Sequence, residues 1–282
     1  MAESFLLVTA NEQPETFLMS HYEEKFSSLS RVYGVEMMKM LASAHICVVG
    51  IGGVGSWAAE ALVRTGVGRI TLVDGDIISR SNANRQIHTL ESTIGQSKVD
   101  TMKKRLLDIN PECEVQTIEQ YLDESNFRDI LERGYDCVID AIDGFKSKTK
   151  MIYCCKRNKI PIITTGGAGG LIDPTKIQVS DLSSTWNDPL AAKVRSELRY
   201  WHGFTRDKRY TFGVPCVYST EQQRYPGKDG NVGYAKPGVS GLSLDCNFGY
   251  GSSVAVTAIF GFTAAAAAIE RIAIKNKVIR KK

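Results

Sequence analysis

Apolar and polar positions alternate in short blocks along the first two thirds of the chain. Five short runs have the apolar or alternating pattern of strands, at 45–50, 69–74, 114–120, 135–140 and 160–164. Five stretches have the apolar spacing of helices, at 22–40, 56–65, 98–109, 126–133 and 149–158. Because strands and helices alternate, we expect an α/β fold: a Rossmann-like, doubly wound, mostly parallel sheet with helices on both faces.

Two later regions depart from this pattern. Residues 183–247 are rich in Gly, Pro, Tyr and charge, and we expect them to be irregular and to face the substrate. Basic and aromatic residues are interleaved there: Lys193, Arg195, Arg199, Tyr200, Trp201, Arg206, Lys208, Arg209 and Tyr210. Such a stretch is either a solvated helix face or a patch that binds phosphates and unstacked bases.

The second region is apolar and close to the C-terminus. Phe248 to Ile269 carries no charge and approaches the length of a membrane span, and a basic tail follows it. Its richness in Gly, Ala, Ser and Thr favours a core or dimer-interface helix, while contact with a membrane remains an alternative. The expected division is a helical leader at 1–44, an α/β core at 45–182, the region 183–247 and the C-terminal extension 248–282, all within one structural domain.

Composition narrows the class of protein. The chain has 282 residues, of which 43% are hydrophobic and 23% charged, with a net charge of +4. These values exclude disorder and permit a nucleic-acid partner without indicating one. The seven cysteines contain no Cys-x-x-Cys pair, so we expect neither a disulfide framework nor bound zinc. The N-terminus lacks the basic-then-apolar pattern of a secretory signal, which favours a cytoplasmic location.

A glycine-rich loop carries the strongest chemical signal. Gly50, Gly52 and Gly55 follow a strand pattern and precede a helix pattern, which is the arrangement that brings a phosphate chain close to backbone N–H groups. Asp74 ends the next strand, where an acid binds ribose hydroxyls. Taken alone, this unit indicates a nucleotide, and a dinucleotide-binding module or dehydrogenase is one interpretation.

The residues that follow favour a triphosphate instead. Arg85 and Lys98 supply charge that suits β- and γ-phosphates and a departing pyrophosphate. The segment Asp140-Ala-Ile-Asp143 ends a later strand, and an acid there suits Mg²⁺, which prefers few carboxylates together with phosphate oxygens. Hydride transfer requires none of these groups.

The order of these motifs resembles the ubiquitin-activating superfamily of adenylating enzymes, including ThiF- and MoeB-like members. That resemblance implies ATP bound by Gly50, Gly52, Gly53, Gly55, Asp74, Asp76, Asn82, Asn84, Arg85, Gln86, Lys98 and Asp143. It implies catalytic roles for Arg85, Lys98 and Asp143, with Mg²⁺ on Asp143. It also implies a homodimer in which Arg31 enters the partner's site, although a plain surface salt bridge explains Arg31 equally well.

Longer segments sharpen the resemblance. They lie at 41–60, 158–161, 164–170, 173–179 and 188–193. Together they are similar to the tRNA threonylcarbamoyladenosine dehydratases. That family implies an ATP-dependent cyclisation of N6-threonylcarbamoyladenosine next to the anticodon of tRNA, through adenylation of the threonyl carboxylate, with AMP and pyrophosphate released. It also suggests a cysteine desulfurase system as partner and leaves a monovalent cation open.

Other interpretations remain at this point. An enzyme that activates the C-terminus of a ubiquitin-like sulfur carrier would use the same ATP chemistry, but such enzymes commonly carry two Cys-x-x-Cys pairs and often a carrier-accepting thiol. Cys216 and Cys246 are expected to be buried structural cysteines rather than such a thiol. The run Gly166 to Gly170 is either an anion nest near the adenylate or a simple turn.

Overall fold

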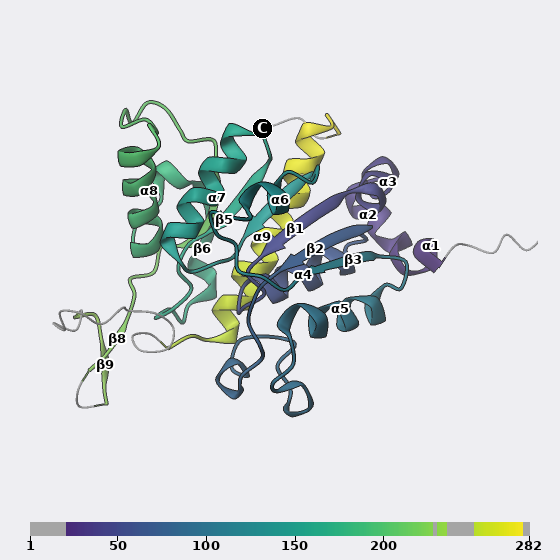
Figure 1. Ribbon diagram of the computed structural model, residues 1–282, viewed down its shortest axis with the longest axis horizontal. Coiled ribbons are helices and arrows are strands. Elements are labelled where there is room, and N and C mark those ends of the chain that lie inside the picture. The colour runs from purple at the N-terminus through teal and green to yellow at the C-terminus, as the bar shows by residue number, and fades with distance from the viewer. Residues whose placement is uncertain (1–20, 228–229, 236–250, 279–282) are drawn as a thin grey trace, which may run out of the picture.

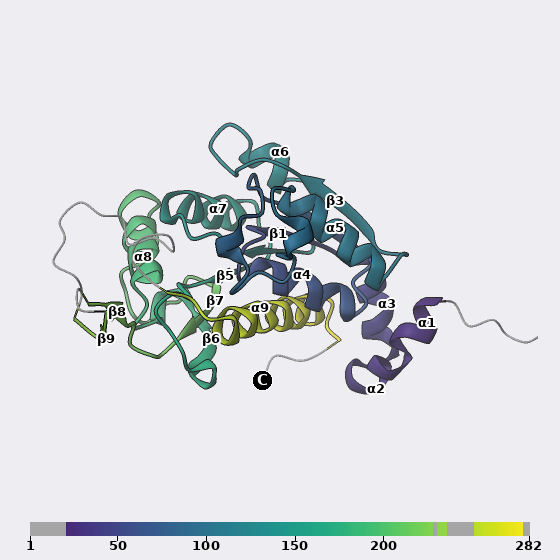
Figure 2. The same ribbon diagram turned by 90° about the horizontal axis from the view of Figure 1, so that it is seen from below.

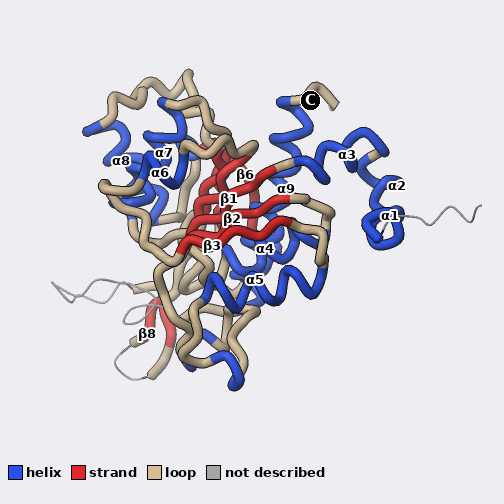
Figure 3. Tube along the Cα trace, turned by 45° about the vertical axis from the view of Figure 1, so that its right-hand side comes forward, coloured by secondary structure: helices blue, strands red, loops and turns tan. Residues whose placement is uncertain are grey.

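The computed structural model describes residues 21–227, 230–235 and 251–278 and contains one large sheet. Its strands are β1 (His45–Val49), β2 (Arg69–Val73), β3 (Glu114–Ile118), β4 (Cys137–Asp140), β5 (Ile162–Thr165), β6 (Ile177–Asp181) and β7 (Pro215–Ser219). They lie in the order β3-β2-β1-β4-β5-β7-β6, and only the β6–β7 pair of this sheet is antiparallel. Figure 3 shows the strands of the sheet in red. The doubly wound, mostly parallel fold is therefore confirmed.

Helices cover both faces of this sheet (Figures 1 and 2). They are α1 (His21–Phe26), α2 (Ser30–Tyr33), α3 (Val35–Ser43), α4 (Gly55–Arg64), α5 (Lys98–Ile109), α6 (Phe127–Leu131), α7 (Phe145–Arg157), α8 (Pro189–Trp201) and α9 (Val254–Lys275). One hydrophobic core joins the sheet to α3, α4, α5 and α9, and a second joins it to α6, α7 and α8. A small hairpin of β8 (Tyr225–Pro226) and β9 (Val232–Gly233) stands apart from the sheet.

Most predicted elements occur close to their expected bounds, and two differences have clear causes. The stretch 22–40 is not one helix, because Gly34 adopts a φ of 83° between α2 and α3. Helix α7 begins at Phe145 rather than at 149, because the buried position of its first turn is Lys148, ion-paired with Asp140, so no apolar residue marks it in the sequence. Residues 1–20 of the expected leader lie outside the described residues.

The expectation that 183–247 is irregular was wrong for much of its length. Helix α8 occupies 13 residues, with Asp188 capping its N-terminus and Pro189 in its first turn. Its buried side chains Ala191, Val194 and Leu198 recur at helical spacing. Strand β7 then enters the sheet between β5 and β6. The α/β core therefore extends past 182; residues 236–247 are not among those described.

The apolar C-terminal segment forms a core helix. Helix α9 is long and apolar enough to cross a membrane, but 61% of its most apolar window is buried inside the protein. It packs across α4, where an added Cβ on Gly261 would lie 2.5 Å from the Val54 carbonyl oxygen and 2.9 Å from the Ala58 nitrogen. Phe262 adds an edge-on contact to Trp57. This packing accounts for the apolar composition without a lipid environment.

We predict that Gly261→Ala destabilises the protein by about 1–3 kcal/mol, the usual cost of overpacking, despite the better helix propensity of alanine. Urea unfolding followed by circular dichroism measures the change. Ala266→Val, at an exposed position of the same helix, is the control and should change stability little. Equal stability of the Gly261→Ala protein and the wild type would contradict the close packing of α9 against α4 at this position.

Candidate active site

The carboxyl ends of β1, β2 and β4 meet at one edge of the sheet. The chain leaves β1 toward β2 on one side, and β4 pairs with β1 on the other. Strand order thus reverses between β1 and β4, and doubly wound proteins bind their ligands in the crevice at such a point. The glycine loop Gly50–Gly55 lies there, directly before α4.

Two glycines of this loop are required by geometry. Gly50 has a φ of 89°, and a Cβ on it would lie 2.9 Å from the backbone of Ala141. A Cβ on Gly55 would lie only 1.8 Å from the Gly50 carbonyl oxygen. Gly52 and Gly53 are less confined, with the side chains of Gln86 and Arg85 nearest to them. The loop therefore folds tightly on itself and presents the N-terminus of α4 to the crevice.

Asp74 fastens this loop to the end of β2. Its Oδ2 accepts a hydrogen bond from the Ile51 N–H at 2.6 Å, and its Oδ1 accepts one from the Asp76 N–H at 2.9 Å. Burial raises the pKa of Asp74, while the neighbouring Lys98 ammonium and these two N–H groups oppose the rise. In addition to the predicted contact with ribose, Asp74 thus has a local role in shaping the loop.

Lys98 lies between two carboxylates. Its Nζ is 2.6 Å from Asp76 Oδ2 and 3.9 Å from Asp74 Oδ2, and its side chain is almost fully buried. Tyr121 donates its hydroxyl hydrogen to Asp76 Oδ1. Burial works to raise the pKa of Asp76, but the hydrogen bonds from Lys98 and Tyr121 outweigh it and leave that pKa lowered.

Tyr121 was missed by the sequence analysis. It follows β3 and is 65% exposed, and its ring covers the Cα of Gly75. The hydrogen bond to Asp76 raises the pKa of Tyr121 to about 12, so the phenol stays protonated as a donor. No spacing in the sequence connects residue 121 to the crevice, because only the β2–β3 pairing brings it there.

The segment with Asn82, Asn84 and Arg85 forms a turn that is held by side-chain hydrogen bonds. Asn82 is buried, and its Oδ1 accepts the Ser79 N–H. Asn84 Nδ2 donates to the Ser252 carbonyl oxygen, which joins the turn to the start of α9. Arg85 Nη1 donates to the carbonyl oxygen of Ser81 and to Asn84 Oδ1. Asn82 and Asn84 therefore hold the backbone that carries Arg85.

Two buried side chains follow on the same segment. Gln86 lies nearest to Gly52, and its Oε1 has no hydrogen-bond partner among the described residues. His88 is only 2% exposed, and neither of its ring nitrogens has a partner in the described part of the chain. Burial, with Lys98 and Arg105 close by, lowers the pKa of His88 to about 4. The imidazole is therefore neutral at physiological pH.

Asp143 lies on the other flank of the glycine loop. It is exposed, two residues beyond Ala141, which packs against Gly50 and Gly55. The preceding acid, Asp140, is fully buried, in contrast to the exposed Asp143. Its Oδ1 is 2.7 Å from Lys148 Nζ, and its Oδ2 accepts the Thr164 hydroxyl at 2.6 Å. Asp140 is therefore a structural ion-pair partner, whereas Asp143 remains accessible to a ligand.

Arg31 is not near this crevice in its own chain. It lies exposed on α2, and the following helix α3 leads directly into the amino end of β1. The crevice lies at the opposite, carboxyl end of the strands. Among the described residues no carboxylate pairs with Arg31, so the surface salt bridge of the alternative interpretation is not formed there.

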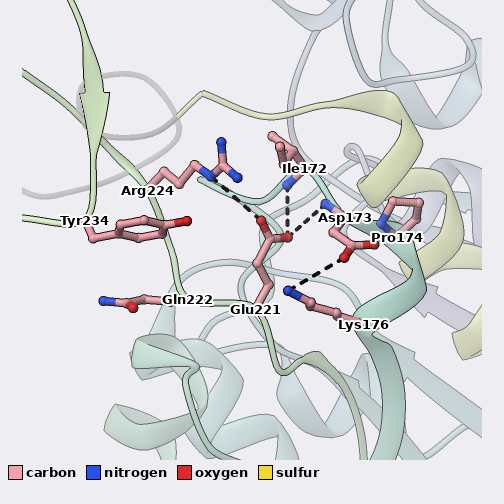
Figure 4. A pocket seen from close by; sticks show the side chains of 8 residues that line it. All are labelled: Ile172, Asp173, Pro174, Lys176, Glu221, Gln222, Arg224 and Tyr234. Atoms are coloured by element: carbon pink, nitrogen blue, oxygen red, sulfur yellow. Dashed lines mark hydrogen bonds and ion pairs between the residues drawn. The ribbon is translucent and has the colours of Figure 1, made fainter.

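Next to the crevice, the segment after β5 is fixed by three buried polar side chains. Asp188 Oδ2 accepts the Gly167 N–H at 3.0 Å, and Gln223 Nε2 donates to the Gly169 carbonyl oxygen at 3.1 Å. Glu221 Oε2 accepts the N–H groups of Ile172 and Asp173 (Figure 4). The run Gly166–Gly170 is therefore a held turn with a defined shape at the carboxyl edge of the sheet.

The basic and aromatic stretch covers α8 and the loop after it. Tyr200, Trp201 and Tyr210 are 68%, 68% and 63% exposed. Arg209 pairs with Asp207, and Arg195 is half-buried with a hydrogen bond to the Thr185 hydroxyl. These aromatic side chains are therefore on the surface rather than in the core.

Burial raises the pKa of each described cysteine thiol. Cys216 is buried in β7, as expected, and burial raises its pKa well above the usual value. Burial likewise raises the pKa values of Cys47, Cys113 and Cys137 to about 12. Cys246 lies outside the described residues. Within the described ranges no three His, Cys, Asp or Glu side chains cluster as a metal site.

The fold and this crevice together define a doubly wound nucleotide-binding protein whose glycine loop is surrounded by cations and carboxylates. A family model agrees: residues 22–278 match the ThiF family. The chain belongs to the ThiF family.

Particular relatives cover nearly the whole chain. The tRNA threonylcarbamoyladenosine dehydratase of Escherichia coli (strain K12) is 47% identical over 255 residues, which is 90% of this chain and 95% of the relative. The protein of that name from Haemophilus influenzae is 44% identical over the same shares. The solved structure of the Escherichia coli dehydratase, TcdA, in complex with ATP superposes with a TM-score of 0.82 at 43% identity, covering 92% of this chain and 98% of that one.

We predict that His88 makes the protein less stable in acid. Its folded-state pKa of about 4 lies below the unfolded value of about 6.5, so between these values the unfolded chain binds more protons. The free energy of unfolding should therefore fall as the pH falls through this window, by on the order of 3 kcal/mol from this group.

Urea unfolding at pH 7.0 and pH 4.5 tests this prediction. His88→Leu should remove that part of the pH dependence, whereas His202→Gln, at a half-buried site, should retain it. An unchanged pH dependence in His88→Leu would contradict the assignment.

Proposed function

We propose that this protein dehydrates N6-threonylcarbamoyladenosine in tRNA, next to the anticodon, at the expense of ATP. The observation that carries the proposal is the set of charged residues beside the glycine loop: Lys98 pairs with Asp76 next to Asp74, Arg85 lies against Gly53, and Asp143 follows Ala141, which contacts Gly50 and Gly55. Similarity to dehydratases over nine tenths of the chain favours tRNA as the substrate over a sulfur-carrier protein.

The reaction has two steps. The threonyl carboxylate oxygen attacks the α-phosphorus of ATP, and pyrophosphate leaves. The carbamoyl group of the same side chain then attacks the activated carbonyl carbon, AMP leaves with the carboxylate oxygen, and a proton is released. The substrate has then lost one water. Because the attacking group belongs to the substrate, proximity accelerates the ring closure and no enzyme nucleophile is required.

The chain's own residues bind and orient the triphosphate. The N-terminus of α4 and the glycine loop offer N–H groups to the phosphates. Lys98 exchanges its contact with Asp76 for a phosphate oxygen, and Arg85 neutralises the departing pyrophosphate. Asp143 fits Mg²⁺, since this ion commonly takes one or two carboxylates and completes its shell with phosphate oxygens and water. When bound, Mg²⁺ would neutralise charge on the phosphates.

A layer of positive charge supports tRNA as the substrate. Besides the buried Lys148, segments 145–159 and 189–209 contain eleven lysine or arginine residues and two acidic ones, although the whole chain carries a net charge of only +4. These segments include α7 and α8, which pack together on one face. Exposed aromatic side chains on α8 and its loop offer stacking partners for unpaired bases. We further propose that the protein is a cytoplasmic homodimer that interacts with a cysteine desulfurase system.

Nucleoside mass spectrometry tests the function. tRNA carrying threonylcarbamoyladenosine is incubated with the protein, ATP and Mg²⁺, digested mildly, and inspected for loss of one water. Lys98→Ala and Asp143→Ala should each lower the rate by about 100-fold or more, because each removes charge stabilisation from the transition state. Asp143 is exposed, so its variant should fold normally.

Lys104→Ala, on the exposed face of α5, is the control and should retain full activity. Absence of any ATP-dependent water loss in the wild type would refute the function.

A complementation experiment tests the place of Arg31. If Arg31 completes the partner's site, Arg31→Ala and Lys98→Ala are each inactive, but a mixture of the two should recover about a quarter of wild-type activity. This fraction follows because half of the re-formed dimers are mixed and each has one intact site. Restored activity is measured after dilution and re-association. A mixture that stays inactive, although subunit exchange is demonstrated, would remove Arg31 from the site.

A further inference from the structure

A second cleft lies beside the nucleotide crevice. It has a volume of about 360 Å³ and is lined by Asn187, Asp188, Pro189, Ala192, Arg195, Gln222, Gln223, Tyr225 and Tyr234. These residues come from the first turns of α8 and from the segment after β7. The cleft is therefore at the carboxyl edge of β5 and β7, and β5 is the direct neighbour of β4, which borders the nucleotide crevice.

Gln223 is the most informative residue of this cleft. It is only 7% exposed, and its Nε2 donates to the Gly169 carbonyl oxygen, which fixes the orientation of the amide. Its Oε1 then has no hydrogen-bond partner among the described residues. A buried acceptor without a partner lowers stability by about 1–3 kcal/mol, so a ligand group that donates a hydrogen bond to it would gain in binding.

The other lining groups define the chemistry of that ligand. Asn187 and Gln222 add two more primary amides. The carboxylate of Asp188 already accepts the N–H groups of Gly167 and Ala191, so its oxygens are engaged inside the protein. Arg195 also lines the cleft and places a positive charge at its wall. Planar amides and a guanidinium suit a planar, polar and anionic group.

We propose that this cleft binds the threonylcarbamoyl group of the substrate nucleotide, and that Gln223 Oε1 accepts a hydrogen bond from one N–H of its ureido linkage. This inference rests on the proposed function and names the residue that distinguishes the modified adenosine from an unmodified one. The ureido linkage is planar, carries N–H donors and ends in a carboxylate, which matches the amides and the cation of the cleft. The hydrogen bond to the Gly169 carbonyl oxygen fixes the Gln223 amide beside the turn that follows β5.

A site built around a buried polar group rejects a ligand that lacks its partner, because the group is then left unpaired. The wild type should therefore bind tRNA that carries the modification more tightly than the same tRNA without it. In Gln223→Met, the affinity for modified tRNA should fall about tenfold or more, toward that of unmodified tRNA. The affinities for unmodified tRNA and for AMP should stay unchanged.

Two further variants separate recognition from structure. Gln223→Glu keeps an acceptor oxygen but loses the N–H group that donates to the Gly169 carbonyl oxygen, so it reports the part of the effect that comes from loosening the turn. Gln178→Met removes a matched glutamine on β6, whose Nε2 donates to the Tyr218 hydroxyl outside the cleft, and should behave as the wild type. Thermal unfolding with and without AMP shows whether each variant is folded.

The outcomes are distinct. A wild type that performs ATP-dependent water loss, together with a Gln223→Met protein that keeps the wild-type ratio of affinities, overturns the role of Gln223 but leaves the proposed function. Equal weakening for both tRNAs and for AMP assigns Gln223 a structural role and also overturns the inference. A wild type without water loss overturns both proposals.

Discussion

The close approach of Gly50 and Gly55 is the constraint on which the site depends. A side chain on Gly55 would overlap the Gly50 carbonyl oxygen, and one on Gly50 would strike the backbone after β4. This turn directs α4 so that its N-terminus faces the crevice. Helix α9 packs on α4, and Gly261 of α9 lies directly against the backbone at the start of α4. One tight turn thus sets the direction of α4, and with it both the proposed phosphate site and the surface on which a long apolar helix packs.

Two buried lysines form ion pairs that have different roles. Lys148 pairs with Asp140 deep inside the protein, where Thr164 completes the set. Breaking such a pair leaves an uncompensated buried charge, so it acts as a fixed link between α7, β4 and β5. Lys98 also pairs with acids, but its partner Asp76 is half-exposed at the crevice. Only this second pair can exchange a carboxylate for a phosphate without opening the core.

The proposed nucleotide site and the proposed threonylcarbamoyl site lie along one edge of the sheet. The ends of β1, β2 and β4 carry the groups that suit a triphosphate, and the ends of β5 and β7 carry amides and a half-buried arginine. The described cysteines, by contrast, have raised pKa values and remain protonated. Acyl transfer to an enzyme thiol therefore has no support in the described residues, whereas attack by a group within the substrate needs none.

The sequence by itself determined the alternation of strands and helices, the glycine loop and the acid after β2, because these depend on local patterns of two to twenty residues. Helix α5 has the same bounds in the sequence prediction and in the structure. The sequence also carried the cap and spacing of α8, but the surrounding Gly, Pro and charge concealed them. Tertiary structure alone decided that Tyr121 contacts Asp76, that Asp140 is buried while Asp143 is exposed, and that Gln223 holds the turn after β5. These contacts join residues 8 to 54 positions apart, and only the pairing and packing of the sheet bring them together.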